Sequence, residues 1–456
     1  MNAMNKFWKI VTGILLTAIF ASSACAADCE NLKQLIELAD KNNPVIFAQQ
    51  QKVRRAEAVV NESTAKMMPK LKGIYAAMWQ ENPMFDVNSL FSDHPLTIKI
   101  PKIEKSFKLP LMMEIPEANN AFTKNNVFVS AALLTQTIYA GGSLSSAKAA
   151  AKLAYKAIQA ESVRVTQTVE NAVRFGYYSY KRAEAKKVVA EEAVSLTNDH
   201  LSQAEKLFKE GVISKADVLR AKVAVADAEL NLIRAKNGME LAKTALERAV
   251  AADIPEVLLS GDACVNSCGN AEPADETTAF ENRAELKMYD FYSRQAAKIA
   301  RAHQGELLPH ILGFGAVTAN SNEGWPEENK NWHVGLAATW NMFDSGEAHA
   351  RTEQARSQSK EFLYRLEDKK NEIRMEVRQA ALNLKEAKAR LDVSNRQLTQ
   401  AEEDYKIAEL RYRESIGTNL DMLDARLALT DSKTNVVDAK YDIALAEANL
   451  QFAIGK

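Results

Sequence analysis

Few residues of this chain have the types and spacing that catalysis or metal binding requires. The six histidines, at positions 94, 200, 303, 310, 333 and 349, show no paired spacing of the kind that metal sites use. The segment Gly141-Gly142-Ser143-Leu144-Ser145 resembles a phosphate-binding loop but lacks the Lys-Ser/Thr pair that such a loop needs. No nucleophile, base and acid stand at diagnostic spacing. The sequence therefore predicts neither an enzyme nor a cofactor.

The first 27 residues have the pattern of a secretory signal peptide. Lys6 and Lys9 flank the start of an apolar run over residues 10–20, and small residues follow at 21–27, which is the order that export signals share. The run is too short to span a membrane, and a buried N-terminal helix is the alternative. No later segment has the roughly 18 apolar residues of a spanning helix. We therefore expect an exported protein that is periplasmic or soluble, or crosses a membrane as β-strands.

The cysteines fit an exported protein. Cys25 would be a lipid-bearing first residue if the signal were that of a lipoprotein, but Ser22 stands where such signals carry a leucine-like residue. Cys264 and Cys268 lie in a Gly- and Asn-rich loop and are expected to form a small disulfide in an oxidising compartment, leaving Cys29 unpaired. A zinc site is the alternative, but it would need two further ligands, and no His or Cys lies nearby in sequence.

Composition favours long helices. The chain has 456 residues, of which 47% are hydrophobic but only 7% aromatic, so most apolar side chains are small or aliphatic and suit closely packed helices. None of the 11 prolines lies in residues 117–254 or 327–456, which permits two long uninterrupted helical regions. The net charge of -1 gives no reason to expect a nucleic-acid partner.

The sequence repeats itself. Residues 208–221 align with 412–425, and residues 139–142 with 343–346, both at an offset of 204. Nearer the start of each half the offset is 240, because an insertion of 36 residues separates Leu71 from Tyr139. Internal duplication at a fixed offset indicates two copies of one structural unit.

Each copy is expected to run helix, strand, loop, strand, long helical hairpin. The segments in order are a signal peptide (1–27), a first repeat (28–254), an inter-repeat loop (255–280) that carries both loop cysteines, and a second repeat (281–456).

Apolar residues on the returning helices step by three and four, large then Ala. Such a heptad seam with alternate small residues lets helices approach closely. A second seam runs beside the first on one helix, so we expect each helix to pack against neighbours on both sides, as in a wall; a two-stranded coiled coil is the alternative and needs one seam. The first seam holds Val218, Ala221, Val225, Ala228, Leu232, Ala235, Met239, Ala242, Leu246 and Ala249, and the second seam holds Leu219, Val223, Ala226, Leu230 and Ile233.

Four strands are expected, at about residues 71–79, 127–138, 311–318 and 332–342. The last alternates Trp332, Val334, Leu336, Ala338, Trp340 and Met342 with smaller or polar residues, and period two with aromatics toward both ends is typical of transmembrane strands. Four strands are too few to close a barrel, and an open edge is forbidden in lipid. Several chains would therefore pool their strands. A soluble hairpin domain on a coiled coil is the alternative.

Six short segments at the starts of helices and strands carry a family resemblance, namely Asn42-Asn43-Pro44, Met68-Pro69-Lys70-Leu71, Leu308-Pro309-His310-Ile311, Asn282-Arg283-Ala284-Glu285-Leu286, Tyr139-Ala140-Gly141-Gly142 and Phe343-Asp344-Ser345-Gly346. In these segments and in both hairpin tips the chain resembles the outer membrane efflux protein family, the TolC-like channels. The resemblance covers essentially the whole mature chain.

The resemblance implies a mainly α fold with a β-barrel portion. It implies a homotrimer whose chains each give four strands to a twelve-stranded barrel in outer-membrane lipid, above a periplasmic α-barrel of long antiparallel coiled-coil helices. Such a protein is a passive exit duct of a tripartite efflux or type I secretion system, which docks to a periplasmic adaptor and an inner-membrane transporter. A periplasmic coiled-coil adaptor or scaffold without a barrel is the alternative. Drugs, metal ions and secreted proteins leave through similar ducts.

By the same resemblance the hairpin tips face the adaptor; turns that only cap a hairpin are the alternative. Ser415 departs from the glycine usual at its place. The tip residues are Gly211, Val212, Ile213, Ser214, Asp217, Ile416, Gly417, Thr418 and Asp421.

Two further features of the sequence carry expectations about the duct. Glu402, Glu403 and Asp404 lie about two turns before the second tip, where three copies of an inward-facing carboxylate would form an acidic ring that favours cations; a solvated face is the alternative. The insertion around residues 82–126 is expected at the outer surface, over the mouth of the duct.

Overall fold

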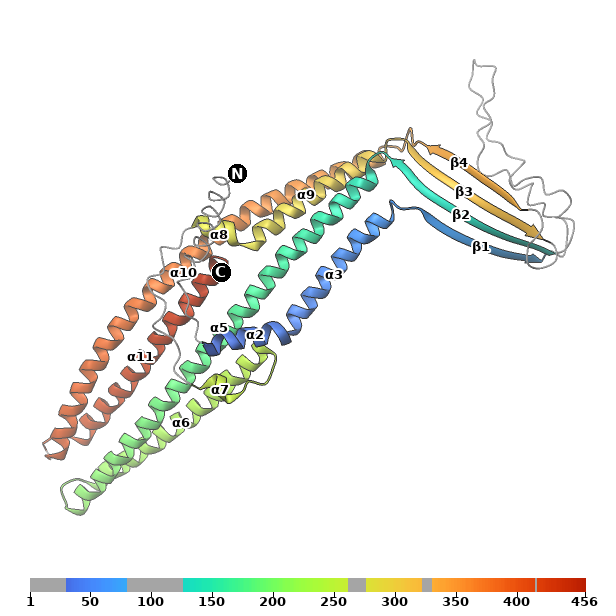
Figure 1. Cartoon of the computed structure of the whole chain (residues 1–456). Coiled ribbons are helices and arrows are strands. Elements are labelled where there is room, and N and C mark those ends of the chain that lie inside the picture. The colour runs from blue at the N-terminus through green and yellow to red at the C-terminus, as the bar shows by residue number, and fades with distance from the viewer. Residues whose placement is uncertain (1–29, 80–125, 261–275, 322–329, 415) are drawn as a thin grey trace, which may run out of the picture. The chain divides into compact units, whose positions relative to one another are not determined.

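The computed structural model describes residues 30–79, 126–260, 276–321, 330–414 and 416–456 (Figure 1). The predicted signal peptide, all four cysteines, Ser415 and nearly all of the insertion lie outside the described residues. The chain forms two compact units. One is built from residues up to 56, 154–293 and 360–456, and the other from residues 57–153 and 294–359.

The first repeat provides the elements from α2 to α6 and the second provides those from α9 to α11, whereas α7 lies in the expected inter-repeat loop and α8 spans the end of it. The helices are α2 (Glu30–Asn42), α3 (Pro44–Ala65), α5 (Ser143–Lys209), α6 (Lys215–Val250), α7 (Glu256–Leu259), α8 (Glu276–Asn282), α9 (Ala284–Gly305), α10 (Glu347–Arg413) and α11 (Asn419–Ala453). The strands are β1 (Lys70–Trp79), β2 (Asn126–Ala140), β3 (His310–Ser321) and β4 (Asn331–Thr339).

The duplication holds in the structure at the offset that the sequence gives. Helices α5 and α10 have 67 residues each and begin at positions 143 and 347, which are 204 apart. The turn that precedes each helix has two successive left-handed residues, Gly141 and Gly142 in the first repeat and Ser345 and Gly346 in the second. The two long hairpins are therefore equivalent residue by residue.

Glycine is required at the first of these turns. The backbone of Gly141 approaches the end of α9 so closely that a Cβ atom would lie 2.1 Å from the carbonyl oxygen of Gly305. Its φ of +59° is also unfavourable for a side chain. At the equivalent position of the second repeat, Ser345 adopts φ +55° with a side chain present.

The helical hairpins are held by two apolar clusters at equivalent positions. In the first, Val173 and Leu246 join α5 to α6 and pack against Leu35 of α2. In the second, their repeat equivalents Val377 and Leu450 join α10 to α11. Burial of these aliphatic side chains stabilises each hairpin by roughly 1.5–3 kcal/mol per residue.

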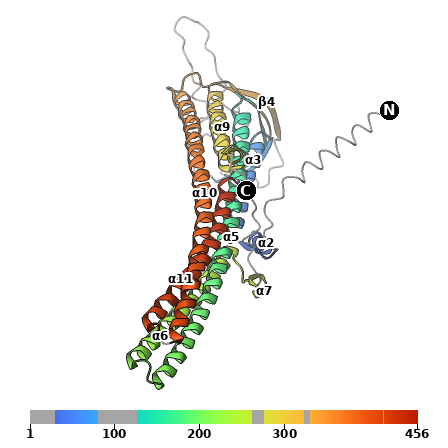
Figure 2. The same cartoon turned by 90° about the vertical axis from the view of Figure 1, so that its left-hand side faces the viewer.

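Helix α11 lies between α5 and α10, as Figure 1 and Figure 2 both show. Asp442 of α11 bonds Arg182 of α5 at 3.3 Å and Arg390 of α10 at 3.0 Å. The predicted first seam of α6 is buried or half-buried along its length. The second seam of α6 is exposed in the single chain, with relative exposures of Leu219 54%, Val223 62%, Leu230 45% and Ile233 56%.

The strands form one antiparallel sheet in the order β1-β2-β3-β4. Strand β4 alternates as predicted and exposes Trp332, Val334 and Leu336 on one face. The strand ends at Thr339, three residues before the predicted end at 342, because Thr339 pairs with His310, the first residue of β3. Strands β1 and β4 are the two edges of the sheet formed by the described residues.

The sequence also predicts that no segment after the signal peptide forms a membrane-spanning helix. Among the described residues, no helix is both long enough and apolar enough to cross a membrane.

Candidate functional site

The first hairpin tip is a tight turn between two caps. The main-chain N–H of Val212 donates to the carbonyl of Leu207 at 2.9 Å, and that of Gly211, at φ +78°, donates to Phe208 at 3.0 Å. This pair of bonds is the Schellman arrangement that ends a helix. Helix α6 then begins at a capping box, in which Asp217 N–H donates to the Ser214 hydroxyl at 3.3 Å and Ser214 N–H donates to the Asp217 carboxylate at 3.2 Å.

The second tip repeats this geometry. Ile416 N–H donates to the Arg411 carbonyl at 2.9 Å, which is the equivalent of the Val212 bond. Thr418 and Asp421 form the second capping box. Hydrogen bonds from the side chain and then the main chain of Thr418 hold the pKa of Asp421 below its usual value. A Cβ atom on Gly417 would lie 3.0 Å from Arg411, so the turn is tight there too.

The tips present small apolar groups on these rigid turns. Val212 is 50% exposed and its repeat equivalent Ile416 is 80% exposed. Main-chain hydrogen bonds at the end of one helix and a capping box at the start of the next hold the backbone on which these exposed side chains stand. All the predicted tip residues lie on these two turns and the first turn of the helix that follows.

A buried polar joint links the two tips. The Nε2 atom of His200 on α5 lies 2.8 Å from the Oδ1 atom of Asn419, the first residue of α11, and the Asn419 amide donates to the carbonyl of Asp217 on α6 at 3.2 Å. The ring of Tyr412 on α10 packs 4.9 Å from that of His200. Burial lowers the pKa of His200. Since the amide oxygen only accepts, the neutral ring donates from Nε2.

The predicted acidic residues are not gathered into one site within the chain. Glu403 is exposed and pairs with Lys406 at 2.8 Å, Asp404 is exposed and Glu402 is half-buried. Consecutive residues of a helix point about 100° apart, so the three carboxylates cannot share one direction. The acidic ring therefore stays a prediction for one of them.

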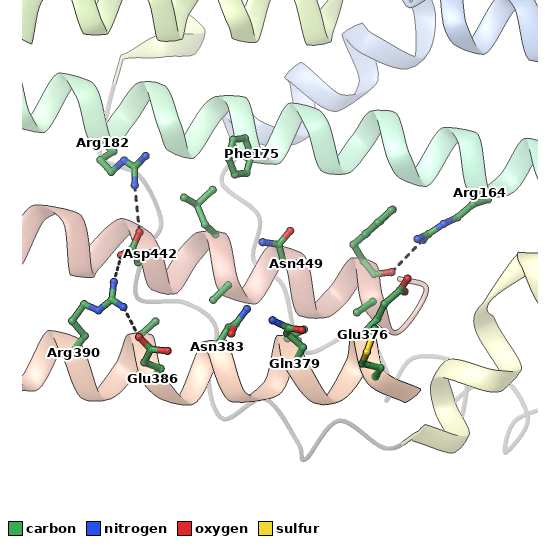
Figure 3. Close-up of a pocket in the computed structure, with 17 residues that line it drawn as sticks. Arg164, Phe175, Arg182, Glu376, Gln379, Asn383, Glu386, Arg390, Asp442 and Asn449 are labelled. Atoms are coloured by element: carbon green, nitrogen blue, oxygen red, sulfur yellow. Dashed lines mark hydrogen bonds and ion pairs between the residues drawn. The ribbon is translucent and has the colours of Figure 1, made fainter. Parts of the chain in front are cut away.

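A groove of about 800 Å³ runs along α5, α11 and α10 (Figure 3). Arg182 and Arg390 point at Asp442 from opposite sides, and Arg390 also bonds Glu386 at 2.5 Å. Exposed Phe175 and Met375 lie on the groove walls. This row of charged side chains along the groove was not predicted from the sequence. Its signal is the i, i+4 spacing of the bases Arg182 and Lys186 and of the acids Asp438 and Asp442, which face one another.

The groove ends at a buried charge cluster around Arg283, which is 1% exposed. Its guanidinium donates to the carbonyl of Ala453 at 2.8 Å and to both oxygens of Glu285 at 3.1 and 3.0 Å, and pairs with Glu376 at 2.7 Å. Arg164 pairs with Glu285 from α5 at 2.8 Å. Burial would raise the pKa of Glu285, but the bonds from Arg283 and both positive charges outweigh burial and lower it.

Within the parts of the chain that the structure describes, no three His, Cys, Asp or Glu side chains are placed to hold a metal ion. The polar clusters connect helices to one another. The described residues thus define a duplicated protein of long helical hairpins with a four-stranded sheet.

Comparison with known protein families agrees with this description of the fold. The sequence matches the outer membrane efflux protein family over residues 35–252 and 277–456. The chain belongs to that family, as its repeats and motifs predict. It is similar to the alkaline protease secretion protein AprF of Pseudomonas aeruginosa, at 25% identity over 260 residues, which are 55% of this chain and 54% of that protein. The match thus spans about half the length of that relative.

Solved structures share the fold. VceC of Vibrio cholerae superposes with a TM-score of 0.74 at 18% identity, over 93% of this chain and 96% of that chain. CusC gives 0.78 at 17% identity, over 94% and 92%. The CmeC outer membrane channel of Campylobacter jejuni gives 0.76 at 17% identity, over 93% and 86%. The predicted fold class, mainly helical with four strands in a duplicated chain, is confirmed.

The family also settles the broad class and location. Its members and the structural neighbours are channel proteins rather than enzymes. The chain is therefore an outer-membrane protein with a large periplasmic part, and it is not an enzyme.

Proposed function

We propose that this chain is the exit duct of a tripartite efflux or type I secretion system, formed when three copies close into one tube. The observation that carries the proposal is that the sheet and the helical wall of a single chain each leave a surface for another chain to cover. Among the described residues, β1 and β4 form the two edges of its sheet, and its helical wall has an exposed apolar seam on α6. Free strand edges and exposed seams recruit further chains.

One face of the sheet exposes the large apolar side chains that are typical of lipid-facing strands. Trp332, Val334 and Leu336 are 76%, 77% and 71% exposed on one face of β4. Burial of that face in hydrocarbon requires that β1 and β4 be paired, because an unpaired edge costs several kcal/mol per polar group in lipid. Three chains of four strands supply twelve, which exceeds the roughly eight strands of the smallest barrels.

The helical wall has complementary edges. The exposed seam of α6 contains Leu219 and Val223, and α10 exposes Leu382, Ile407 and Leu410 on the other side of α11. Two different surfaces that meet head to tail generate a ring when the rotation closes. Three chains with two equivalent hairpins each would give a tube of six similar units.

The tips fit a periplasmic adaptor. Val212 and Ile416 stand on fixed turns with their apolar side chains exposed, which is a surface that a helical hairpin of a partner can cover. Energy would come from an inner-membrane transporter, which also selects the cargo. An acidic ring from one of Glu402, Glu403 and Asp404 is part of this proposal. A barrel-free adaptor is not favoured, since the family match includes both repeats and the sheet.

Fractionation and crosslinking test the proposal. We expect the chain in outer-membrane fractions as a trimer that dissociates on heating. A photocrosslinking residue at Val212 or Ile416 should capture a periplasmic protein in cells. The matched control is Leu241 of α6, which is 72% exposed but lies away from the tips. Recovery as a soluble monomer, or equal capture at Leu241, would contradict the proposal.

A further inference from the structure

Four of the contacts that join the two hairpins of one chain lie between α5 and α11 and are spaced over most of the length of α11. The contacts are His200 to Asn419 at 2.8 Å, Glu192 to Lys433 at 2.6 Å, Arg182 to Asp438 at 3.9 Å, and Arg164 over the ring of Phe452 at 3.6 Å.

The duplication transfers this joint to a second place. Helix α10 repeats α5, and α6 is the repeat equivalent of α11, at the same offset of 204 residues. If α10 met α6 in the geometry in which α5 meets α11, the same positions would face one another. The four facing pairs would be Asp404 with Lys215, Arg396 with Glu229, Glu386 with Arg234, and Asp368 with Arg248.

All four transferred pairs have opposite charges. All eight side chains are exposed in the single chain. The complementarity is not inherited from the duplication, because the signs differ: α5 contributes Glu192 and Arg182, whereas α10 contributes Arg396 and Glu386 at the equivalent positions. Charges of opposite sign at an interface fix its register and disfavour other pairings.

Further contacts of the joint transfer without a new ion pair, among them the bond from Arg426 to Thr197, whose repeat equivalents are Lys222 and Ala401. Arg182 with Asp442 maps to Glu386 with Gly238, which is neutral on one side. Lys186 with Asp438 maps to Arg390 with Arg234. Arg390 is already neutralised within its own chain by Glu386 and Asp442, at 2.5 and 3.0 Å, so this like-charged pair is screened.

Apolar contacts transfer as well. Val437 of α11 and Tyr178 of α5 pack in one small cluster. Their repeat equivalents are Ile233 and Leu382, which are 56% and 58% exposed in the single chain. An Ile233–Leu382 contact between chains would bury both, which favours association by roughly 25 cal/mol per Å² removed from water.

We propose that α10 of one subunit docks on α6 of the next in the geometry of the α5–α11 joint, held by the four charge pairs given above. The occupant of the exposed α6 face is thus a second copy of this chain, in a defined register. The inference rests on the proposed trimer and adds which side chains meet. It also assigns Asp404 to the interface between subunits, which leaves Glu402 and Glu403 for the lumen.

Crosslinking within a matched pair of variants tests the register. Arg396→Cys with Glu229→Cys, treated with a short bismaleimide, should give covalent dimers and trimers on denaturing gels. Glu192→Cys with Lys433→Cys is the repeat-equivalent pair within one chain and should leave the mass unchanged. The unsubstituted protein controls for the native cysteines.

Charge reversal provides the second measurement. Glu229→Arg should abolish the heat-stable trimer by placing like charges together, and adding Arg396→Glu should restore it. A wild-type trimer without the Arg396–Glu229 crosslink, or a double reversal that fails to restore assembly, would overturn the register but leave the proposed duct intact. A wild-type protein that forms no trimer would overturn both.

Discussion

Removing the guanidinium of Arg283 should destabilise the protein strongly. Arg283 lies between α8 and α9 and is almost wholly buried. It satisfies the carbonyl of Ala453 near the end of α11, and it neutralises Glu285 and Glu376. The substitution Arg283→Met keeps the aliphatic volume but leaves these partners without the guanidinium.

The size of the stability loss follows from the partners that Glu285 and Glu376 keep in Arg283→Met. Breaking a buried ion pair costs about 3–5 kcal/mol because it leaves an uncompensated charge. Glu285 keeps Arg164 at 2.8 Å, so it stays neutralised. Glu376 loses its partner, but its side chain is 35% exposed and partly solvated. We therefore expect the lower end, about 3 kcal/mol, which lowers the unfolding temperature by about 5 °C or more.

Thermal unfolding followed by circular dichroism measures this effect at fixed protein concentration. Arg283→Lys keeps the charge but loses the fork that reaches Glu285 and Glu376 together, so it should fall between the wild type and Arg283→Met. Adding Glu376→Gln to Arg283→Met should recover part of the loss. A wild-type unfolding temperature for Arg283→Met would refute the structural role of the cluster.

Three further predictions concern the joint and the turns. The pKa of His200 is lowered by burial, so stability present above its ordinary value of 6.5 should be lost as the pH falls through the lowered pKa; His200→Asn should flatten the change in unfolding temperature between about pH 7.5 and pH 5.5. Gly141→Ala should destabilise by at least about 1–2 kcal/mol, whereas Ser345→Gly, at the equivalent turn, should change stability by less than about 1 kcal/mol; equal effects would contradict the close approach to α9. Thr418→Ala should cost about 1 kcal/mol in denaturant unfolding by removing the cap of α11, and no change would show that the capping box is not formed.

The repeat made much of the fold accessible from the sequence. The offset of 204 placed the two long hairpins at equivalent positions, because insertions inside a continuous hairpin would break its heptad seam. The tip positions came from the repeat and the family resemblance, and the structure shows the capping pairs Ser214–Asp217 and Thr418–Asp421 there. These are local features, and local chemistry determines them.

Contacts between residues far apart in the sequence were harder to predict from the sequence. The end of β4 depends on where its partner β3 begins, so alternation alone extended it to 342 instead of Thr339. The Arg283 motif was used as a family mark, but its burial depends on Glu376 and Ala453, which are distant in sequence. Similarly, the pairing of Asp442 with two helices appears only when α11 is placed between them.

In the proposed duct, three chains together close both the sheet and the helical wall. Cryo-electron microscopy of the full-length protein, purified from outer membranes into lipid nanodiscs, tests it directly. We expect three copies, a closed barrel of twelve strands in which β1 of one chain pairs with β4 of the next, and α10 facing α6 across each boundary. A particle closed by a single chain, or one in which Trp332, Val334 and Leu336 lie in a protein core, would contradict it.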